Sequence, residues 1–194
     1  MKFTQIATAI ALGLALSTAA QAATQTSTFN VKIQITGTCA ANSFPNAALP
    51  AGSDLTFATQ PSATGAVSLL ATNDAAAPAD SLTVKCTKGT AVTVALQPAT
   101  VGIAGVGSMA GTGSNTDTIA YQLIQPTASG SPVAYTVGAI GGTAWGSGIN
   151  ALSVTGQGMT VGIKLPVTAT ITAANALDVA ADSYNEVVTA TLTY

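Results

Sequence analysis

A segment near the start of the chain alternates strictly between apolar and polar side chains, and it constrains the fold more than any other feature. Residues Phe29–Ile35 read F-N-V-K-I-Q-I, which places four apolar side chains on one face of a strand: Phe29, Val31, Ile33 and Ile35. Successive side chains of a strand point to opposite faces, so this period of two predicts a half-buried β-strand. Chain ends are usually polar and poorly ordered unless something holds them. We therefore expect this segment to be buried against another strand, and the identity of that strand to determine function.

The first 22 residues have the composition of a secretory signal peptide. Lys2 supplies a positive charge, Ile6–Leu16 is an apolar run, and Ala20–Ala22 reads A-Q-A, which matches an A-x-A cleavage site. The apolar run is too short to cross a bilayer, and no second run of sufficient length follows. We expect residues 1–22 to be removed and the rest of the chain to be exported and soluble.

The composition after this leader fits one well-packed domain. Hydrophobic residues make up 48% of the sequence, which excludes the disordered class. The formal net charge of −2, with no arginine and no histidine, provides no electrostatic footprint for nucleic acid or an anionic membrane. Only 6% of residues are charged, fewer than a free monomer normally needs for solubility. Such a surface suits contacts between copies of the same chain.

The two cysteines, Cys39 and Cys86, form an even pair in a chain that is expected to be exported. One disulfide is the simplest interpretation in an oxidising compartment. Closing a loop of this length contributes about 4 kcal/mol in the chain-entropy view. A redox or metal role would require a C-x-x-C pair or partnering histidines, and the sequence has neither.

Short segments rich in β-branched and aromatic residues alternate with turn residues along the chain. The expected strands are Leu55–Ala58, Val67–Ala71, Leu82–Cys86, Ala91–Leu96, Thr118–Ile124, Val133–Val137, Thr160–Ile171 and Val187–Tyr194. Thr87–Thr90 is a connection of hairpin length, Gly102–Asn115 is expected to be a glycine-rich loop, and Pro166 marks an edge or a bulge. No segment after the leader has convincing helical periodicity. The pattern therefore predicts an all-β sandwich or barrel.

The sequence lacks the usual equipment of an enzyme. Without histidine it has neither the usual general base nor the commonest metal ligand. No serine lies in a G-x-S-x-G or S-x-x-K motif. The acidic residues are Asp54, Asp74, Asp80, Asp117, Asp178, Asp182 and Glu186. Paired-carboxylate hydrolysis stays open as a minor alternative, but most of these residues lie in expected turns, where Asp usually bonds nearby backbone. We expect no catalytic residue, no cofactor and no metal site.

Two further motifs have a functional and a structural interpretation. Gly105–Ala110 spells a dinucleotide fingerprint, but the strand before it and the helix after it are missing, so we interpret it as a flexible loop. Trp145 lies among glycines and could stack on a sugar, although a lone Trp in a small all-β domain is more often part of the core. No basic stripe interleaved with aromatic residues indicates a nucleic-acid partner.

The last expected strand, Val187–Tyr194, has one apolar face that needs to be covered. Its apolar side chains alternate with threonines and are Val188, Ala190, Leu192 and Tyr194. In a sandwich, a strand with one apolar face needs neighbours on both sides, or it presents an open edge. The Phe29–Ile35 strand can pair with it within one molecule or between molecules, and the sequence leaves both open. The intermolecular contact is heterologous and does not close, so it would build a filament.

These same segments carry a resemblance to a known family, the archaic chaperone–usher pilins, which share the spore coat protein U domain. The resemblance rests on short motifs in order along nearly the whole chain after the leader. They are the alternating strand followed by G-T-C at Gly37–Cys39, L-T-V-K-C-T at Leu82–Thr87, I-A-Y-Q-L-I at Ile119–Ile124, W-G-S-G at Trp145–Gly148, and D-S-Y-N-E at Asp182–Glu186 before the last strand. The family tail is usually closer to G-D-Y-x-D, so Ala181 and Glu186 depart from it.

The resemblance implies an incomplete immunoglobulin-like sandwich that a neighbouring subunit completes. It divides the chain into the signal peptide (1–22), an N-terminal donor-strand extension (23–37) and the pilin domain (38–194). It places the four apolar side chains of the donor strand in a groove beside the last strand of another subunit.

The resemblance also implies the partners and the location. A periplasmic chaperone would lend a strand until an outer-membrane usher exchanges it for the donor strand of the next pilin. The product would be an extracellular fibre that supports adhesion and biofilm formation, with this chain as a shaft subunit and a separate tip adhesin. The alternative is a self-complemented monomer that binds carbohydrate or a surface.

Overall fold

The computed structural model describes residues 30–41, 55–59, 69–73, 82–100, 104–176 and 178–194. Contacts divide the chain into two units, one that ends at Ile35 and one that runs from Thr36 to Tyr194. Residues 1–22 and Phe29 lie outside the described residues. In the described part, no helix is both long and apolar enough to cross a membrane.

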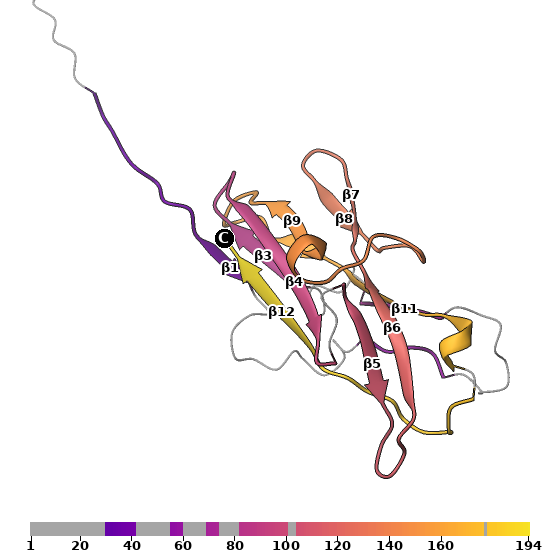
Figure 1. The fold of residues 1–194 in the computed structure, drawn as a ribbon. Coiled ribbons are helices and arrows are strands. Elements are labelled where there is room, and N and C mark those ends of the chain that lie inside the picture. Colours follow the sequence, from indigo (N-terminus) through magenta and orange to yellow (C-terminus); the bar gives the residue numbers. More distant parts are fainter. Residues whose placement is uncertain (1–29, 42–54, 60–68, 74–81, 101–103, 177) are drawn as a thin grey trace, which may run out of the picture. The chain divides into compact units, whose positions relative to one another are not determined.

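The unit from Thr36 to Tyr194 is built from strands, so the predicted all-β class is confirmed (Figure 1). The strands are β1 (Cys39–Ala41), β2 (Leu69–Asn73), β3 (Leu82–Cys86), β4 (Ala91–Pro98), β5 (Val106–Ala110), β6 (Thr118–Ile124), β7 (Thr127–Ser129), β8 (Ala134–Thr136), β9 (Leu152–Thr155), β10 (Ile163–Leu165), β11 (Val167–Ile171) and β12 (Val188–Thr193). Two short 3-10 turns, η1 (Gly148–Asn150) and η2 (Ala173–Ala176), are the only helical elements of the described residues.

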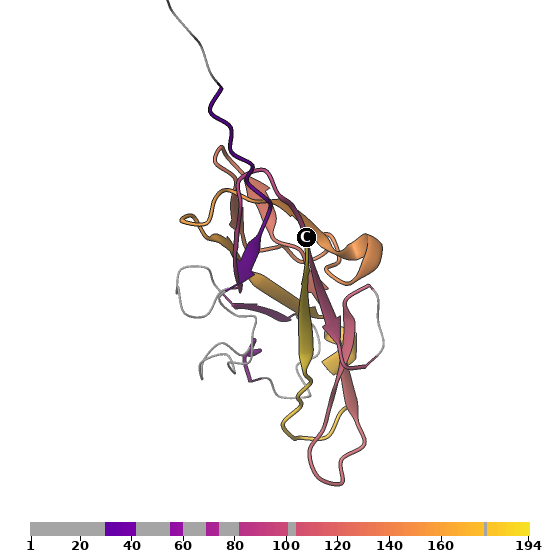
Figure 2. The same cartoon turned by 90° about the vertical axis from the view of Figure 1, so that its left-hand side faces the viewer.

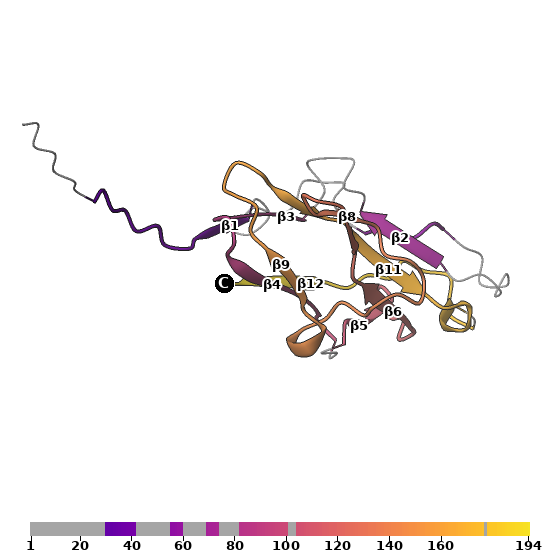
Figure 3. The ribbon, with the colours of Figure 1, turned by 90° about the horizontal axis from the view of Figure 1, so that it is seen from above.

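The strands form open, antiparallel sheets around one core. The sheet orders are β1-β3-β10, β2-β11-β6-β5 and β12-β4-β9, with a small β7-β8 hairpin beside them. Figure 3 shows β3 in one layer and β4 and β9 in the facing layer. Alternation along the strands points every second side chain inward, and the two layers contribute the following apolar side chains to the same core: Leu82, Val84, Ile163 and Leu165 from one, Val92, Val94, Leu96, Leu152 and Val154 from the other.

Trp145 is part of this core. Its side chain is fully buried, and its indole Nε1 donates a hydrogen bond of 2.9 Å to the Val94 carbonyl oxygen. Its backbone N–H donates to the Leu123 carbonyl oxygen at 2.9 Å. Trp145 therefore joins β4 to β6, as the core interpretation predicts, and is not available to stack on a sugar at the surface.

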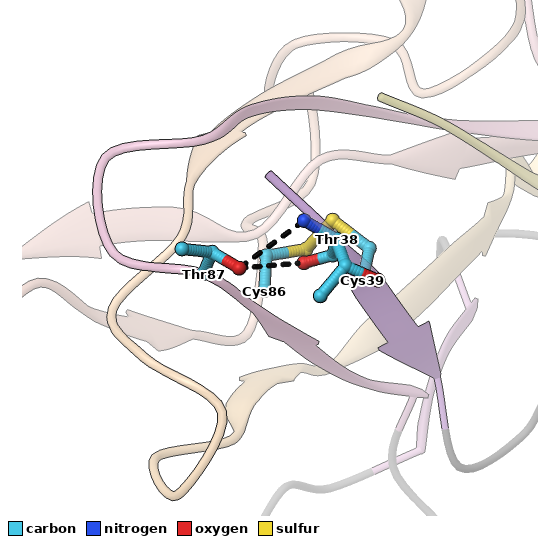
Figure 4. Close-up of a disulfide and its surroundings, with 4 residues drawn as sticks. All are labelled: Thr38, Cys39, Cys86 and Thr87. Carbon is cyan, nitrogen blue, oxygen red and sulfur yellow. Dashed lines mark hydrogen bonds between the residues drawn. A yellow bond between two sulfur atoms is a disulfide. The ribbon is translucent and has the colours of Figure 1, made fainter. Parts of the chain in front are cut away.

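Cys39 and Cys86 form the expected disulfide (Figure 4). They are directly opposed in the β1–β3 ladder, and their Cα atoms lie 4.1 Å apart. Next to the disulfide, the Thr38 backbone N–H donates to Thr87 Oγ1 at 3.1 Å, and the Thr87 backbone N–H donates to the Thr38 carbonyl oxygen at 2.9 Å. The disulfide thus holds β1, a strand of only three residues, at the edge of its sheet.

Two connections differ from their expected roles. Thr87–Thr90 has hairpin length, but it leads from β3 to β4, which lie in different sheets. The expected long strand Thr160–Ile171 is two strands, β10 and β11, which also belong to different sheets. Pro166 lies between them, at a position where the chain changes sheet and needs no ladder hydrogen bond from its nitrogen.

The strand positions differ from the expectations at several places. Leu55–Ala58 lies in no strand. Gly102–Asn115 is not a loop throughout, because it contains β5, which pairs along its whole length with β6. β1, β7 and β9 are strands where none was expected, and β9 pairs with β4. The described residues of the expected strand Phe29–Ile35 lie in no strand. The predicted Val67–Ala71 strand corresponds to β2, which begins at Leu69; residues 67 and 68 lie outside the described part.

Candidate subunit interface

The alternating segment after Phe29 lies outside the strands of the structure. Its three described apolar side chains are exposed: Val31 by 87%, Ile33 by 87% and Ile35 by 75%. Single exposed apolar residues are ordinary, but three on one face of an extended segment form a continuous apolar row. The segment therefore exposes a row of apolar side chains with the spacing that a sheet partner would cover.

The predicted last strand is present as β12, and it pairs antiparallel with β4. Val188 is opposite Pro98, Ala190 opposite Leu96, and Leu192 opposite Val94. Directly opposed residues share a face of the sheet, so these three β12 side chains point toward the core. Tyr194 follows the end of β12 and is 63% exposed.

The burial of these opposed residues differs across the ladder. Leu96 and Val94 are 4% and 0% exposed, whereas the β12 side chains opposite them are only partly buried against the core. Among the described residues β12 pairs on one side only, with β4. Figure 2 looks onto this edge, where β12 (yellow) and β1 (purple) border the two layers. The core-facing side of β12 is therefore incompletely covered along this edge.

The chain leading into β12 is held by polar contacts that sequence analysis missed. Asp182 accepts hydrogen bonds from the Thr112 backbone N–H at 2.7 Å, from Asn115 Nδ2 at 2.8 Å, and from the Thr112 hydroxyl. These hydrogen bonds, that of the Thr112 hydroxyl first, hold the pKa of the Asp182 carboxyl well below its usual range. Asp182 therefore does more than bond nearby backbone, because Thr112 lies 70 residues away in the sequence.

Further contacts continue along this lead-in, which we call the tail strap (Asp182–Val187). The Tyr184 hydroxyl donates to the Ala180 carbonyl oxygen at 2.7 Å and accepts from Asn115 Nδ2 at 3.1 Å. Asn185 and Ala110 exchange two backbone hydrogen bonds of 3.1 Å. The strap thus runs antiparallel to the end of β5 before the chain continues as β12.

Glu186 lies where the tail strap becomes β12. Its Oε1 accepts from the Thr100 backbone N–H at 2.6 Å and from the Thr100 hydroxyl, and its Oε2 accepts from the Ser108 backbone N–H at 2.8 Å. The buried Tyr121 hydroxyl also contacts this carboxylate, and burial, followed by the hydrogen bond with Glu186, raises the pKa of Tyr121. One carboxylate thereby joins the end of β4 to β5.

Gly107 makes room for this arrangement. A Cβ at Gly107 would lie 2.3 Å from Tyr121 Cζ and 2.4 Å from Glu186 Oε2, closer than real contacts permit. The glycine of the apparent dinucleotide fingerprint is therefore a packing position inside β5, and the interpretation of this stretch as a flexible loop is wrong. Within the described part of the chain, no group of three His, Cys, Asp or Glu side chains could hold a metal ion. Asp54, Asp74 and Asp80 lie outside it.

The Spore Coat Protein U domain model matches residues 25–191 of this chain. A comparison with curated proteins found no match. Among solved structures, the chain is similar to one in the CsuC–CsuE chaperone–tip adhesion subunit pre-assembly complex from archaic chaperone–usher Csu pili of Acinetobacter baumannii (14% identity, TM-score 0.45), covering 82% of this chain and 40% of that one. It is also similar to a chain of a chaperone–tip adhesin complex of CFA/I fimbriae biogenesis (15% identity, TM-score 0.40), covering 75% of this chain and 39% of that one. The family match spans most of the 194 residues, and the chain belongs to the Spore Coat Protein U domain family.

Proposed function

We propose that this protein is a structural pilin that polymerises by donor-strand complementation. The observation that carries the proposal is the incomplete cover of β12, whose core-facing side chains are only partly buried beside fully buried neighbours on β4. An added strand would complete both the hydrogen-bond ladder and the core at this edge. The donor in this proposal is the alternating segment Phe29–Ile35 of another copy.

The energetics favour a long-lived contact. Burying four large apolar side chains contributes on the order of 6–12 kcal/mol, before ladder hydrogen bonds are counted. Ordering a free segment of seven residues offsets part of this gain. Dissociation would require the whole strand to separate at once, so the polymer gains kinetic stability as well.

The geometry of this contact would produce a filament. The donor segment precedes β1, and the acceptor is β12, so each copy would use two different surfaces. A heterologous contact of this kind extends without closing. In this proposal the chain is a shaft subunit of an extracellular fibre that supports adhesion and biofilm formation. A periplasmic chaperone, an outer-membrane usher and a tip adhesin are its partners on the way to the cell surface.

Deletion of Thr24–Ile35 tests the proposal directly. The truncated chain keeps its acceptor edge and loses its donor, so we expect it to accept a donor from the full chain but to propagate no further. Mixing it with full-length protein should shorten the polymers in proportion to its share, measured by sedimentation velocity. Fibres formed by the truncated chain alone would refute the proposal.

The same measurement addresses the alternative of a self-complemented binding module. A full-length chain that stays monomeric after export, with residues 29–35 protected from proteolysis, would support that alternative. Trp145 could not be its sugar-binding residue, because it is buried.

A further inference from the structure

The register of β12 is the feature on which an acceptor role depends. The strand reads Val-Thr-Ala-Thr-Leu-Thr, so a shift by one residue would turn three threonines inward and the three apolar side chains outward. Register is normally fixed by full burial of one face. Here that face is only partly buried, so packing alone specifies the register less strongly than in the neighbouring β4.

The residue placed to compensate for this weakness is Glu186. It lies two residues before β12, and both of its carboxylate oxygens are engaged by backbone N–H groups of other segments. Thr100 follows the end of β4, the strand that pairs with β12, and Ser108 lies in β5. A carboxylate held from two sides by charge-assisted hydrogen bonds fixes the position of its own backbone along both strands.

Backbone contacts continue this alignment on either side of Glu186. The Ala99 N–H donates to the Val187 carbonyl oxygen at 3.0 Å, directly before the first β12 pair of Val188 with Pro98. On the other side, Asn185 pairs with Ala110 of β5. Glu186 therefore lies at the junction of two ladders, one with β5 and one with β4.

We infer that Glu186 is a positioning residue, which sets the register of β12 so that Val188, Ala190 and Leu192 lie on the core-facing side that an incoming donor strand would complete. The role of Glu186 in the register of β12 concerns this chain alone, and only its consequence for assembly rests on the proposed function. The Glu186 side chain reaches both the Thr100 and the Ser108 backbone N–H groups.

Paired cysteines can report the register. Thr189 and Gln97 are opposed and exposed, and opposed residues of an antiparallel ladder lie about 4.5–5.5 Å apart between Cα atoms, within the range that a disulfide spans. Ala190 opposes Leu96 in the native register and lies on the other face of the sheet from Gln97, and a shift by one residue would bring Ala190 opposite Gln97. The full chain carrying Thr189→Cys with Gln97→Cys should oxidise completely, and the chain carrying Ala190→Cys with Gln97→Cys should not.

Glu186→Gln is then added to each reporter, with Asp178→Asn as the matched control. Both changes replace a carboxylate by an isosteric amide, and Asp178 is exposed and outside the tail strap. The amide nitrogen of glutamine cannot accept a hydrogen bond, so one of the two backbone N–H groups loses its acceptor. We therefore expect the Thr189 reporter to oxidise roughly tenfold more slowly or less completely, and the Ala190 reporter to gain crosslinking. Asp178→Asn should change neither. Fluorescence of Trp145, the single tryptophan, verifies in each case that the core is intact.

A rescue experiment separates positioning from a general loss of stability. Polymer assembly by Glu186→Gln should fall, and oxidation of the Thr189→Cys and Gln97→Cys pair should restore it, because the crosslink fixes the same register. Unchanged crosslinking in both reporters, with the Trp145 fluorescence intact, would overturn the inference. Restored register without restored assembly would overturn the assembly consequence. If the unsubstituted chain does not polymerise, the proposed function fails, while the crosslinking pattern still decides the role of Glu186.

Discussion

Replacing Ile33 by aspartate tests which face of the proposed donor strand is buried in a neighbouring copy. Ile33 is the central member of the exposed apolar row, with Val31 and Ile35 on either side, and it is 87% exposed in the described chain. Ile33→Asp therefore removes no core contact of its own subunit, and its folding stability should change by less than about 0.5 kcal/mol.

In the proposed assembly, the substitution costs free energy where the donor strand is buried in a neighbouring copy. The substitution loses the burial of one large side chain, about 1.5–3 kcal/mol, and adds a buried carboxylate without a partner, which costs more than the ~1–3 kcal/mol of a neutral polar group. Together these weaken each subunit contact by at least roughly 3 kcal/mol, which corresponds to at least about 10²-fold in the dissociation constant. Long polymers should be replaced by monomers and short oligomers.

The matched control is Gln34→Asp, which introduces the same carboxylate one position later, on the opposite face of the strand. Sedimentation velocity of the exported full-length proteins, at equal concentration, gives the size distribution of each. Trp145 fluorescence shows whether the domain is folded. Equal polymer lengths for Ile33→Asp and the unsubstituted chain would refute the proposed donor face. A loss of assembly only in Gln34→Asp would mean that the opposite face of the strand, with Gln34, is the buried one.

Three other predictions concern the domain itself. Gly107→Ala should lower the free energy of unfolding by roughly 1–3 kcal/mol in urea titrations followed by Trp145 fluorescence, because the added methyl group meets Tyr121 and Glu186, while Ser108→Ala should be near neutral. Reduction of the Cys39–Cys86 disulfide should cost up to about 4 kcal/mol and expose β1 to hydrogen exchange before β3; an unchanged urea midpoint would contradict this. Asp182→Asn should lower the melting temperature at neutral pH, and the difference from the unsubstituted chain should shrink only as the pH falls below the usual carboxyl range. The direction of this pH dependence follows from the lowered pKa of Asp182. The ionised carboxylate stabilises the fold at pH values above its unfolded-state pKa, and this contribution is lost as the pH falls through the folded-state pKa.

Strong β patterns were predictable from the sequence, and the connections between them were not. Thr118–Ile124 and Leu82–Cys86 are strands with the expected bounds, because larger apolar side chains alternate in them with polar or small ones. β5 was missed because Gly107 and small neighbours have low strand propensity, and only the contact with Tyr121 and Glu186 explains the glycine. A four-residue connection such as Thr87–Thr90 has the same composition whether it joins paired strands or crosses between sheets.

For the candidate interface, alternation predicted which side chains of the last strand face inward, and pairing with β4 places Val188, Ala190 and Leu192 on that face. Sequence reasoning treated the acidic tail residues as turn formers, because their partners lie far away in the chain. The contact of Glu186 with Thr100 spans 86 residues, and no local pattern encodes such a distance. The single available signal was the occurrence of carboxylates directly before a strand in a chain with so few charges.

The two strands that border the incompletely covered edge are both held by something other than apolar packing. β1 is fixed by the disulfide from Cys39 to Cys86, and β12 is fixed by the Glu186 carboxylate at its start. The inner strands β3, β4, β6 and β11 are instead packed by buried apolar side chains such as Val84, Val94, Leu123 and Ile171. A covalent bond and charge-assisted hydrogen bonds do not depend on a neighbouring strand being present, whereas apolar packing at this edge does. A domain that must hold an unfilled edge before it receives a strand needs its bordering strands fixed in this way, so weakening either device should impair acceptance of a donor more than it impairs the core.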